Sequence, residues 1–156
     1  MSKVVVITGG TRGIGFGLVR EFLKRDCKVV FCGRSQASAD KALAQITAEF
    51  GAADVLGVPC DISDGAQLQA LWDAATQRFG RVDIWINNAG IGNRMRPVWE
   101  VDEAELRDVI DTNLTGSMLA ARVAIRGMMA QPDGGHFYLM EGFGSSGSLR
   151  VGMSPY

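Results

Sequence analysis

The sequence predicts an α/β domain with a doubly wound parallel sheet and helices on both faces, a three-layer αβα arrangement. Short apolar runs alternate with longer segments of helical periodicity, and a glycine-rich turn follows the first run. The apolar runs show little polar alternation, as expected for strands that are buried on both faces. In such a fold, right-handed crossovers place the ligand crevice at the carboxyl ends of the strands.

Five runs are expected to be strands because each is short, apolar and bounded by turn or helix signals. They are Lys3 to Ile7, Lys28 to Cys32, Asp54 to Val58, Val82 to Asn87 and Gly135 to Met140.

Helices are expected between these strands. Ile14, Leu18 and Phe22 recur every four residues, which predicts an amphipathic helix lying on the sheet. Ala42, Ile46 and Phe50 show the same spacing. A longer helix is expected from Asp102 to about Met129, starting with a capping box formed by Asp102 and Glu105.

Composition favours a single domain, residues 1–156. The chain has 156 residues, of which 47% are hydrophobic and 21% charged, which is enough apolar material for one core. The net charge is −1, and the basic residues are dispersed among acids, so we expect no nucleic-acid partner. Near the N-terminus, the apolar run Val4 to Ile7 is too short for a signal segment or a membrane span. We therefore expect a soluble, cytoplasmic protein with no membrane span.

The cysteines do not predict a metal site. Cys27, Cys32 and Cys60 form no Cys-x-x-Cys pair and have no histidine nearby, which excludes the common zinc spacings. Cys32 and Cys60 lie at the ends of apolar runs, so we expect buried thiols that behave as small hydrophobic groups.

The segment Thr8 to Gly15 predicts a cradle for a dinucleotide phosphate. It reads Thr-Gly-Gly-Thr-Arg-Gly-Ile-Gly and stands between a strand and a helix, the setting that such a cradle requires. Glycines allow positive φ and a close approach of the backbone to the ligand, and the helix N-terminus faces the anion. The residues expected to bind are Gly9, Thr11, Arg12, Gly13, Ile14 and Gly15. The alternative is an ordinary glycine-rich loop.

The end of the second strand favours NADP(H) over NAD(H). A site that prefers NAD places a carboxylate there to bind the ribose hydroxyls. Here the sequence is Cys32-Gly33-Arg34, and Arg34 offers a planar cation suited to a 2′-phosphate. Arg12 is a candidate for a second phosphate contact. In the alternative interpretation, either arginine is only a solvated surface charge.

The order and spacing of these motifs resemble the short-chain dehydrogenase/reductase family and its Rossmann-type fold. Besides the glycine turn, the matching segments are Cys60-Asp61-Ile62, Asn87-Asn88-Ala89-Gly90 and Asp111-Thr112-Asn113. The resemblance implies that Asp61, with Ile62 beside it, contacts adenine. It also implies that the Asn87 to Gly90 turn supports the sheet and lines the adenosine ribose, with Asn88, Ala89 and Gly90 as its binding residues, and that Asn113 belongs to a proton relay.

The resemblance also implies hydride transfer between a nicotinamide and a carbonyl or alcohol carbon, with Tyr156 as the general acid/base. A free tyrosine has a pKa of about 10, so it needs a nearby cation to act near neutrality. The family's lysine, which follows the tyrosine, is absent from this sequence. Family members reach about 250 residues, so the chain resembles an N-terminal fragment whose sheet ends at an open edge. The alternatives are a short nucleotide-binding protein without turnover and a module used only for association.

The catalytic serine departs from the family pattern. In the family, a serine upstream of the tyrosine, at the end of the fifth strand, binds the substrate carbonyl. Counting back from Tyr156 by the family's spacing gives Phe143, which has no hydroxyl. The nearest hydroxyl groups are those of Ser145 and Ser146, of which we favour Ser145. The alternative is a flexible linker. The stretches 128–137 and 140–145 resemble the chlorophyll(ide) b reductase branch, in which glycines also precede a serine, although Glu141 replaces the branch's usual aspartate. That resemblance implies reduction of a ring formyl group to a hydroxymethyl group by NADPH.

The substrate is therefore expected to be a small-molecule carbonyl or alcohol. In the family, the helix that corresponds to Asp102 to Met129 pairs across a dimer interface. With Ala121, Ala124 and Ile125 expected on its exposed face, this implies a homo-oligomer in the full-length form.

Overall fold

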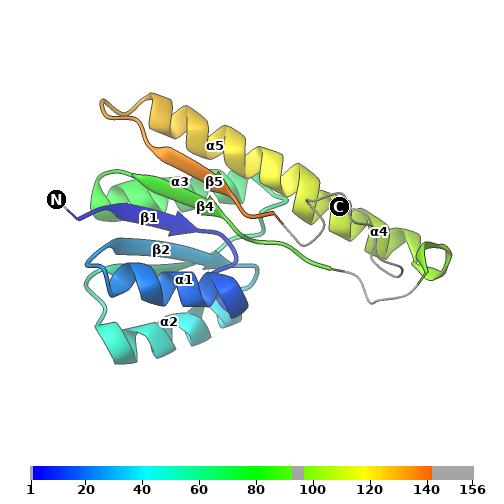
Figure 1. Cartoon of the computed structure of the whole chain (residues 1–156), viewed down its shortest axis with the longest axis horizontal. Coiled ribbons are helices and arrows are strands. Elements are labelled where there is room, and N and C mark those ends of the chain that lie inside the picture. The colour runs from blue at the N-terminus through cyan, green and yellow to red at the C-terminus, as the bar shows by residue number, and fades with distance from the viewer. Residues whose placement is uncertain (1, 93–96, 142–156) are drawn as a thin grey trace.

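The computed structural model describes residues 2–92 and 97–141. These residues form a five-stranded sheet with helices on both faces, which confirms the predicted fold class (Figure 1). The elements, in chain order, are β1 (Val4–Ile7), α1 (Gly13–Leu23), β2 (Lys28–Gly33), α2 (Gln36–Phe50), β3 (Val55–Pro59), α3 (Gly65–Phe79), β4 (Ile84–Asn87), the 3-10 turn η1 (Val98–Glu100), α4 (Glu103–Ile110), the π-helical segment η2 (Asp111–Gly116), α5 (Ser117–Met129) and β5 (His136–Leu139).

The strand order is β3-β2-β1-β4-β5, and all neighbouring pairs are parallel. The chain thus moves outward from β1 to β3 on one side and then returns to build β4 and β5 on the other. This reversal separates the two crossovers that follow β1 and β4, and it opens a crevice at their carboxyl ends.

The strands fill a core on each face of the sheet because successive side chains point to opposite sides. On one face, Phe31 and its neighbours pack against Val19 of α1 and Ile46 of α2. On the other, Val30 and Trp85 pack against α3 and α5. Figure 1 shows α1 and α2 on one side of the sheet and α3 and α5 on the other.

The buried face of α1 differs from the prediction. Ile14 is 68% exposed, and the buried stripe is Gly15, Val19 and Leu23. The first turn of α1 stands at the carboxyl edge of the sheet, so Ile14 faces the crevice instead of the strands. In α2, the predicted Ala42 and Ile46 are both buried.

The expected long helix from residue 102 to 129 is interrupted. Between α4 and α5, residues Asp111–Gly116 form a π-helical segment. The predicted capping box is also wrong, because the Asp102 side chain makes no cap hydrogen bond. The first turn of α4 instead carries Glu103 and Glu105, whose negative charges favour the positive end of a helix dipole.

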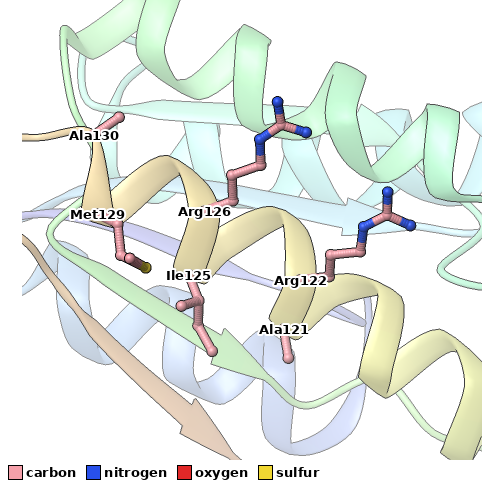
Figure 2. A pocket seen from close by; sticks show the side chains of 6 residues that line it. All are labelled: Ala121, Arg122, Ile125, Arg126, Met129 and Ala130. Atoms are coloured by element: carbon pink, nitrogen blue, oxygen red, sulfur yellow. The ribbon is translucent and has the colours of Figure 1, made fainter.

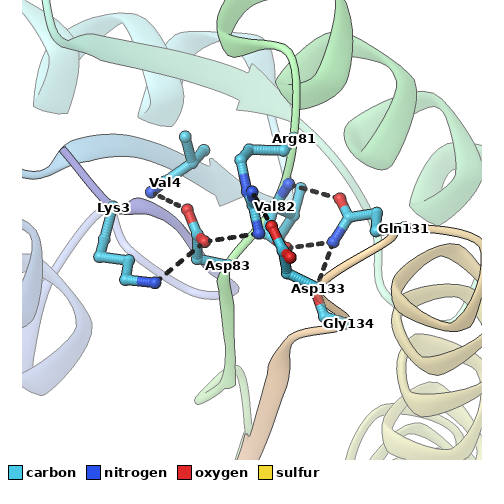
Figure 3. Close-up of polar contacts among 8 residues, drawn as sticks. All are labelled: Lys3, Val4, Arg81, Val82, Asp83, Gln131, Asp133 and Gly134. Carbon is cyan, nitrogen blue, oxygen red and sulfur yellow. Dashed lines mark hydrogen bonds and ion pairs between the residues drawn. The ribbon is translucent and has the colours of Figure 1, made fainter. Parts of the chain in front are cut away.

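A polar cluster joins the segments at the amino edge of the sheet (Figure 3). The carboxylate of Asp83, which is 4% exposed, accepts a 2.8 Å hydrogen bond from the Val4 amide and forms ion pairs with Lys3 and Arg81. The Gln131 side chain accepts from Val82 N and donates to Val82 O, both at 2.9 Å. Because Gln131 binds both the N–H and the C=O of Val82, these groups are not available to a neighbouring strand. The strand β4 starts at Ile84, later than expected.

Candidate functional site

A cavity of about 510 Å³ lies at the carboxyl ends of β1, β2 and β4. It gathers every residue that the sequence predicted for coenzyme binding, from five separate segments of the chain. Its lining consists of Gly9, Thr11, Arg12, Gly13, Ile14, Gly15, Gly33, Arg34, Ser35, Ser38, Cys60, Asp61, Ile62, Asn88, Ala89, Gly90, Ile91 and Thr112. The binding roles of these residues stay predictions.

The glycine turn is shaped by close backbone contacts. A Cβ on Gly15 would lie 2.2 Å from the carbonyl oxygen of Gly9 and 2.5 Å from Asn88 Nδ2, so only glycine fits there. Gly13 has φ +55°, a left-handed conformation that favours glycine. Gly13 is also the first residue of α1, and the side chain of the N-cap residue Arg12 makes no cap hydrogen bond. An uncapped helix N-terminus at a cavity suits an anion, so the turn fits a diphosphate.

Thr8 ties the end of β1 to the end of β4. It is fully buried, and its Oγ1 accepts hydrogen bonds from the amides of Asn88 and Ala89 at 3.0 Å each and donates to Asn87 Oδ1 at 3.2 Å. The Asn88 amide Nδ2 donates to the carbonyl oxygens of Thr8 and Gly9. The two turns that form the cavity are therefore held against each other by side chains of the motifs themselves.

Asn113 lies in the π-helical segment, and its side chain makes two hydrogen bonds to the main chain of one residue, Ile91. Its Nδ2 donates to the Ile91 carbonyl at 2.8 Å, and its Oδ1 accepts from the Ile91 amide at 2.9 Å. This pair of hydrogen bonds fixes the chain that leaves β4 against η2. The side chain of Asn113 therefore supports the wall of the cavity at Ile91, and its proton-relay role stays a prediction.

The loop after β3 brings Asp61 to the cavity. Its Oδ1 accepts from both the amide and the hydroxyl of Ser63, at 3.0 and 2.7 Å, which fixes the orientation of the carboxylate. Ile62 is 4% exposed and belongs to the core.

Cys32 and Cys60 are both buried, as predicted, and they are free thiols. A hydrogen bond to Cys32, together with burial, raises the pKa of Cys60, so this thiol stays protonated at neutral pH. Within residues 2–92 and 97–141, no three histidine, cysteine, aspartate or glutamate side chains gather in a way that could hold a metal ion.

Arg12 and Arg34 are exposed at the cavity. In the part of the chain that the structure describes, neither guanidinium takes part in an ion pair, which is also true of Arg78, Arg122 and Arg126, whereas Arg20, Arg25, Arg81 and Arg107 are paired. Two cations without a protein counterion at one cavity fit a ligand that carries more than one phosphate.

Ser145, Ser146 and Tyr156 lie outside the described residues. Conversely, the structure adds Thr8, Ser35, Ser38, Ile91 and Thr112 to the site or its support. The spacing of Ser35 and Ser38 is a sequence signal for a helix N-terminus, and these residues do form the capping box of α2. No sequence signal identifies Ile91, because only its main chain is used.

The fold and the cavity define a dinucleotide-binding α/β protein with the glycine turn at the first crossover. Comparison with known families agrees: the family model described as short chain dehydrogenase matches residues 3–136. The chain belongs to the short-chain dehydrogenase family.

Relatives and solved structures give the same assignment. The rice (Oryza sativa subsp. japonica) protein named Chlorophyll(ide) b reductase NOL, chloroplastic, is 42% identical over 153 residues, covering 97% of this chain and 45% of the relative. A short-chain dehydrogenase/reductase from Burkholderia phymatum in complex with NAD has TM-score 0.81 and 33% identity, covering 88% of this chain and 48% of that one. The structure described as ElxO with NADP bound has TM-score 0.86 and 25% identity, covering 97% and 60% of the two chains. The chain thus spans less than half the length of the rice relative.

The expectation of a cytoplasmic protein is contradicted, because the matching reductases of rice and Arabidopsis thaliana are named as chloroplastic. The lack of a long apolar run near the N-terminus does not indicate a cytoplasmic protein, because chloroplast transit peptides are amphipathic and serine-rich rather than apolar. Among the described helices, none combines the length and apolar character needed to cross a bilayer.

Proposed function

We propose that this chain carries the coenzyme-binding part of an NADP-dependent oxidoreductase. The observation that supports this most directly is the cavity itself, in which the glycine turn, Arg34, Asp61 and the Asn88 to Gly90 turn converge. A nicotinamide coenzyme, when bound, supplies or accepts a hydride at a carbonyl or alcohol carbon of a small-molecule substrate. The chain's own residues bind and orient it.

In this proposal the diphosphate lies against the amides of the Gly9 to Gly15 turn and the N-terminus of α1. Asp61 and Ile62 receive the adenine, and Asn88, Ala89 and Gly90 form the wall beside the ribose. Arg34 and Arg12 bind the 2′-phosphate, which is the basis of the proposed preference for NADP(H) over NAD(H). Tyr156 is the general acid/base, Ser145 binds the substrate oxygen, and Asn113 serves the proton relay.

The names of the relatives support a more specific proposal for the substrate. The matching rice and Arabidopsis proteins are named as reductases of chlorophyll(ide) b, and the Met128 to Ser145 region resembles that branch. We therefore propose reduction of a ring formyl group on a large planar tetrapyrrole to a hydroxymethyl group.

Association is the second candidate function, and the outer face of α5 favours it. A shallow groove of about 530 Å³ follows this helix, lined by Ala121, Arg122, Ile125, Arg126, Met129 and Ala130 (Figure 2). Ile125 is 45% and Met129 81% exposed. Ala124 was expected on this face as well but is fully buried, because it points into the core between α5 and the sheet. The remaining face suits a homo-oligomeric contact in the full-length form.

The coenzyme proposal is tested by titrating the purified chain with NADPH and NADH and following nicotinamide fluorescence. We expect NADPH to bind more tightly. Arg34→Asp should weaken NADPH binding by about 10- to 100-fold, because a charge-assisted hydrogen bond contributes about 1.5–3 kcal/mol. The same variant should change NADH binding by less than about threefold, because NADH has no 2′-phosphate.

Arg126→Asp is the matched control. It makes the same change of charge on an exposed arginine that lines the α5 groove and not the cavity. An equal loss of NADPH affinity in both variants would refute the 2′-phosphate contact, since only a general change of charge would then be at work. Failure of the unmodified chain to bind either coenzyme would favour the association function.

A further inference from the structure

Two side chains close over the carboxyl end of β2. A Cβ atom on Gly33, the last residue of the strand, would lie 2.3 Å from Thr11 Cγ2 and 2.9 Å from Ser38 Oγ. Nonbonded carbon atoms are at their optimum near about 3.5–4.0 Å, so no side chain fits at residue 33 while its neighbours stay in place.

The two obstacles differ in how closely they approach, because Thr11 contributes two of the three nearest atoms and Ser38 only one, at 2.9 Å. The Ser38 hydroxyl is also held in the capping box of α2: it donates to the Ser35 carbonyl at 2.8 Å and accepts from the Ser35 hydroxyl at 3.1 Å and the Ser35 amide at 3.4 Å. Thr11 is β-branched and stiff about χ1. Its second branch atom, Oγ1, lies 3.2 Å from the same point. Thr11 is therefore the main obstacle.

The lack of space for a side chain at residue 33 affects which coenzyme a dinucleotide site can bind. A carboxylate at the end of the second strand binds the ribose hydroxyls of NAD, and Gly33 occupies that end here. We infer that Thr11 determines coenzyme choice, because it fills the space that a ribose-binding carboxylate at residue 33 would need. Arg34 is then the first side chain after the strand that can reach the cavity. This inference rests on the proposed function and adds Thr11 as a specificity-determining residue.

The test combines a carboxylate at residue 33 with two replacements of Thr11. Gly33→Asp is made alone, with Thr11→Ala, and with Thr11→Val. Valine keeps both branch positions of threonine, whereas alanine removes them. Each protein is titrated with NADH and NADPH by fluorescence.

Gly33→Asp alone should weaken both coenzymes at least tenfold, since the new side chain displaces the turn. The Thr11→Ala/Gly33→Asp protein should recover NADH binding and bind NADH at least tenfold more tightly than NADPH. The Thr11→Val/Gly33→Asp protein should behave like the single variant. A gain of NADH binding in Gly33→Asp alone, or equal recovery with valine and alanine, would overturn the inference.

A readout without coenzyme separates this inference from the proposed function. Gly33→Ala should lower the urea midpoint of unfolding when residue 11 is threonine or valine, and Thr11→Ala should restore most of the loss. If the unmodified chain binds neither coenzyme, the proposed function fails, even where this restoration is seen. If NADPH binds but Thr11→Ala does not restore the urea midpoint of the Gly33→Ala protein, the proposed function stands and the role of Thr11 is refuted.

Discussion

Gly127 in α5 allows a close contact with Trp72 of α3, and this contact makes a strong prediction. A Cβ on Gly127 would lie 2.2 Å from Trp72 Cζ2 and 2.3 Å from Cε2. The indole ring is 8% exposed and stacks on Trp85, with ring centroids 6.3 Å apart. Trp85 is fully buried, so the Trp72 ring packs against a neighbour inside the core.

The expected effect of Gly127→Ala is the difference between two opposing terms. Replacing a glycine inside a helix by alanine stabilises by about 0.5–1 kcal/mol. Forcing an extra methyl group into a packed core costs about 1–3 kcal/mol, and a clash with two atoms of a rigid ring belongs at the upper end of that range. We therefore expect a net loss of about 2 kcal/mol in the free energy of unfolding.

Gly17 in α1 is the matched control. It is exposed, and a Cβ there would meet nothing within 4 Å. Gly17→Ala should thus stabilise by about 0.5–1 kcal/mol. Urea unfolding followed by circular dichroism measures both variants, and a Trp72→Leu background should remove most of the cost of Gly127→Ala. Stabilisation by both glycine replacements would refute the packing argument.

Three further predictions concern the site, the amino edge and pH. Gly15→Ala should weaken NADPH binding at least tenfold by fluorescence titration, because its Cβ would lie 2.2 Å from the Gly9 carbonyl oxygen; Gly17→Ala should not, and unchanged affinity in Gly15→Ala would contradict the cradle. Gln131→Leu should cost about 2 kcal/mol in urea unfolding, because it leaves both peptide groups of Val82 unpaired; a loss below about 0.5 kcal/mol would show that water replaces the amide. Hydrogen bonds from Arg25 and then Lys24 lower the pKa of Glu21 from 4.5 to about 2. A group whose folded pKa is lowered stabilises above its unfolded pKa and loses this effect as pH falls through the folded value. The stability difference between the unmodified chain and Glu21→Gln should therefore be present at about pH 7, shrink below about pH 4.5, vanish near about pH 2 and decrease with salt; a difference that does not change with pH would exclude the ion pairs as its cause.

The sequence predicted the sheet because strand and helix periodicities are local properties. Each expected strand exists, with ends shifted by one or two residues. The larger shift at β4 arises from Gln131, which lies far along the chain and takes the peptide groups of Val82. The π-helical segment between α4 and α5 was also not predicted, because its residues continue the helical pattern of the two helices.

The sequence predicted which motifs meet at the cavity, but it did not predict the hydrogen bonds that hold the cavity wall in place. The glycine turn, Asp61 and the Asn88 to Gly90 turn each follow a strand, and strands of a parallel sheet bring their carboxyl ends to one edge. The two hydrogen bonds between Asn113 and the main chain of Ile91 could not be read from residue types, because a backbone partner leaves no mark in the sequence.

By itself the sequence determined the fold class, the family resemblance and the chemical groups offered at the cavity, since these depend on short-range periodicity and on motifs contiguous in the chain. The tertiary structure alone decided which glycines are irreplaceable. The space at Gly33 and Gly127 is set by Thr11 and Trp72, whose distances from them depend on how separate segments pack. Packing distances of a few tenths of an ångström are properties of the assembled core, and no local pattern of residues encodes them.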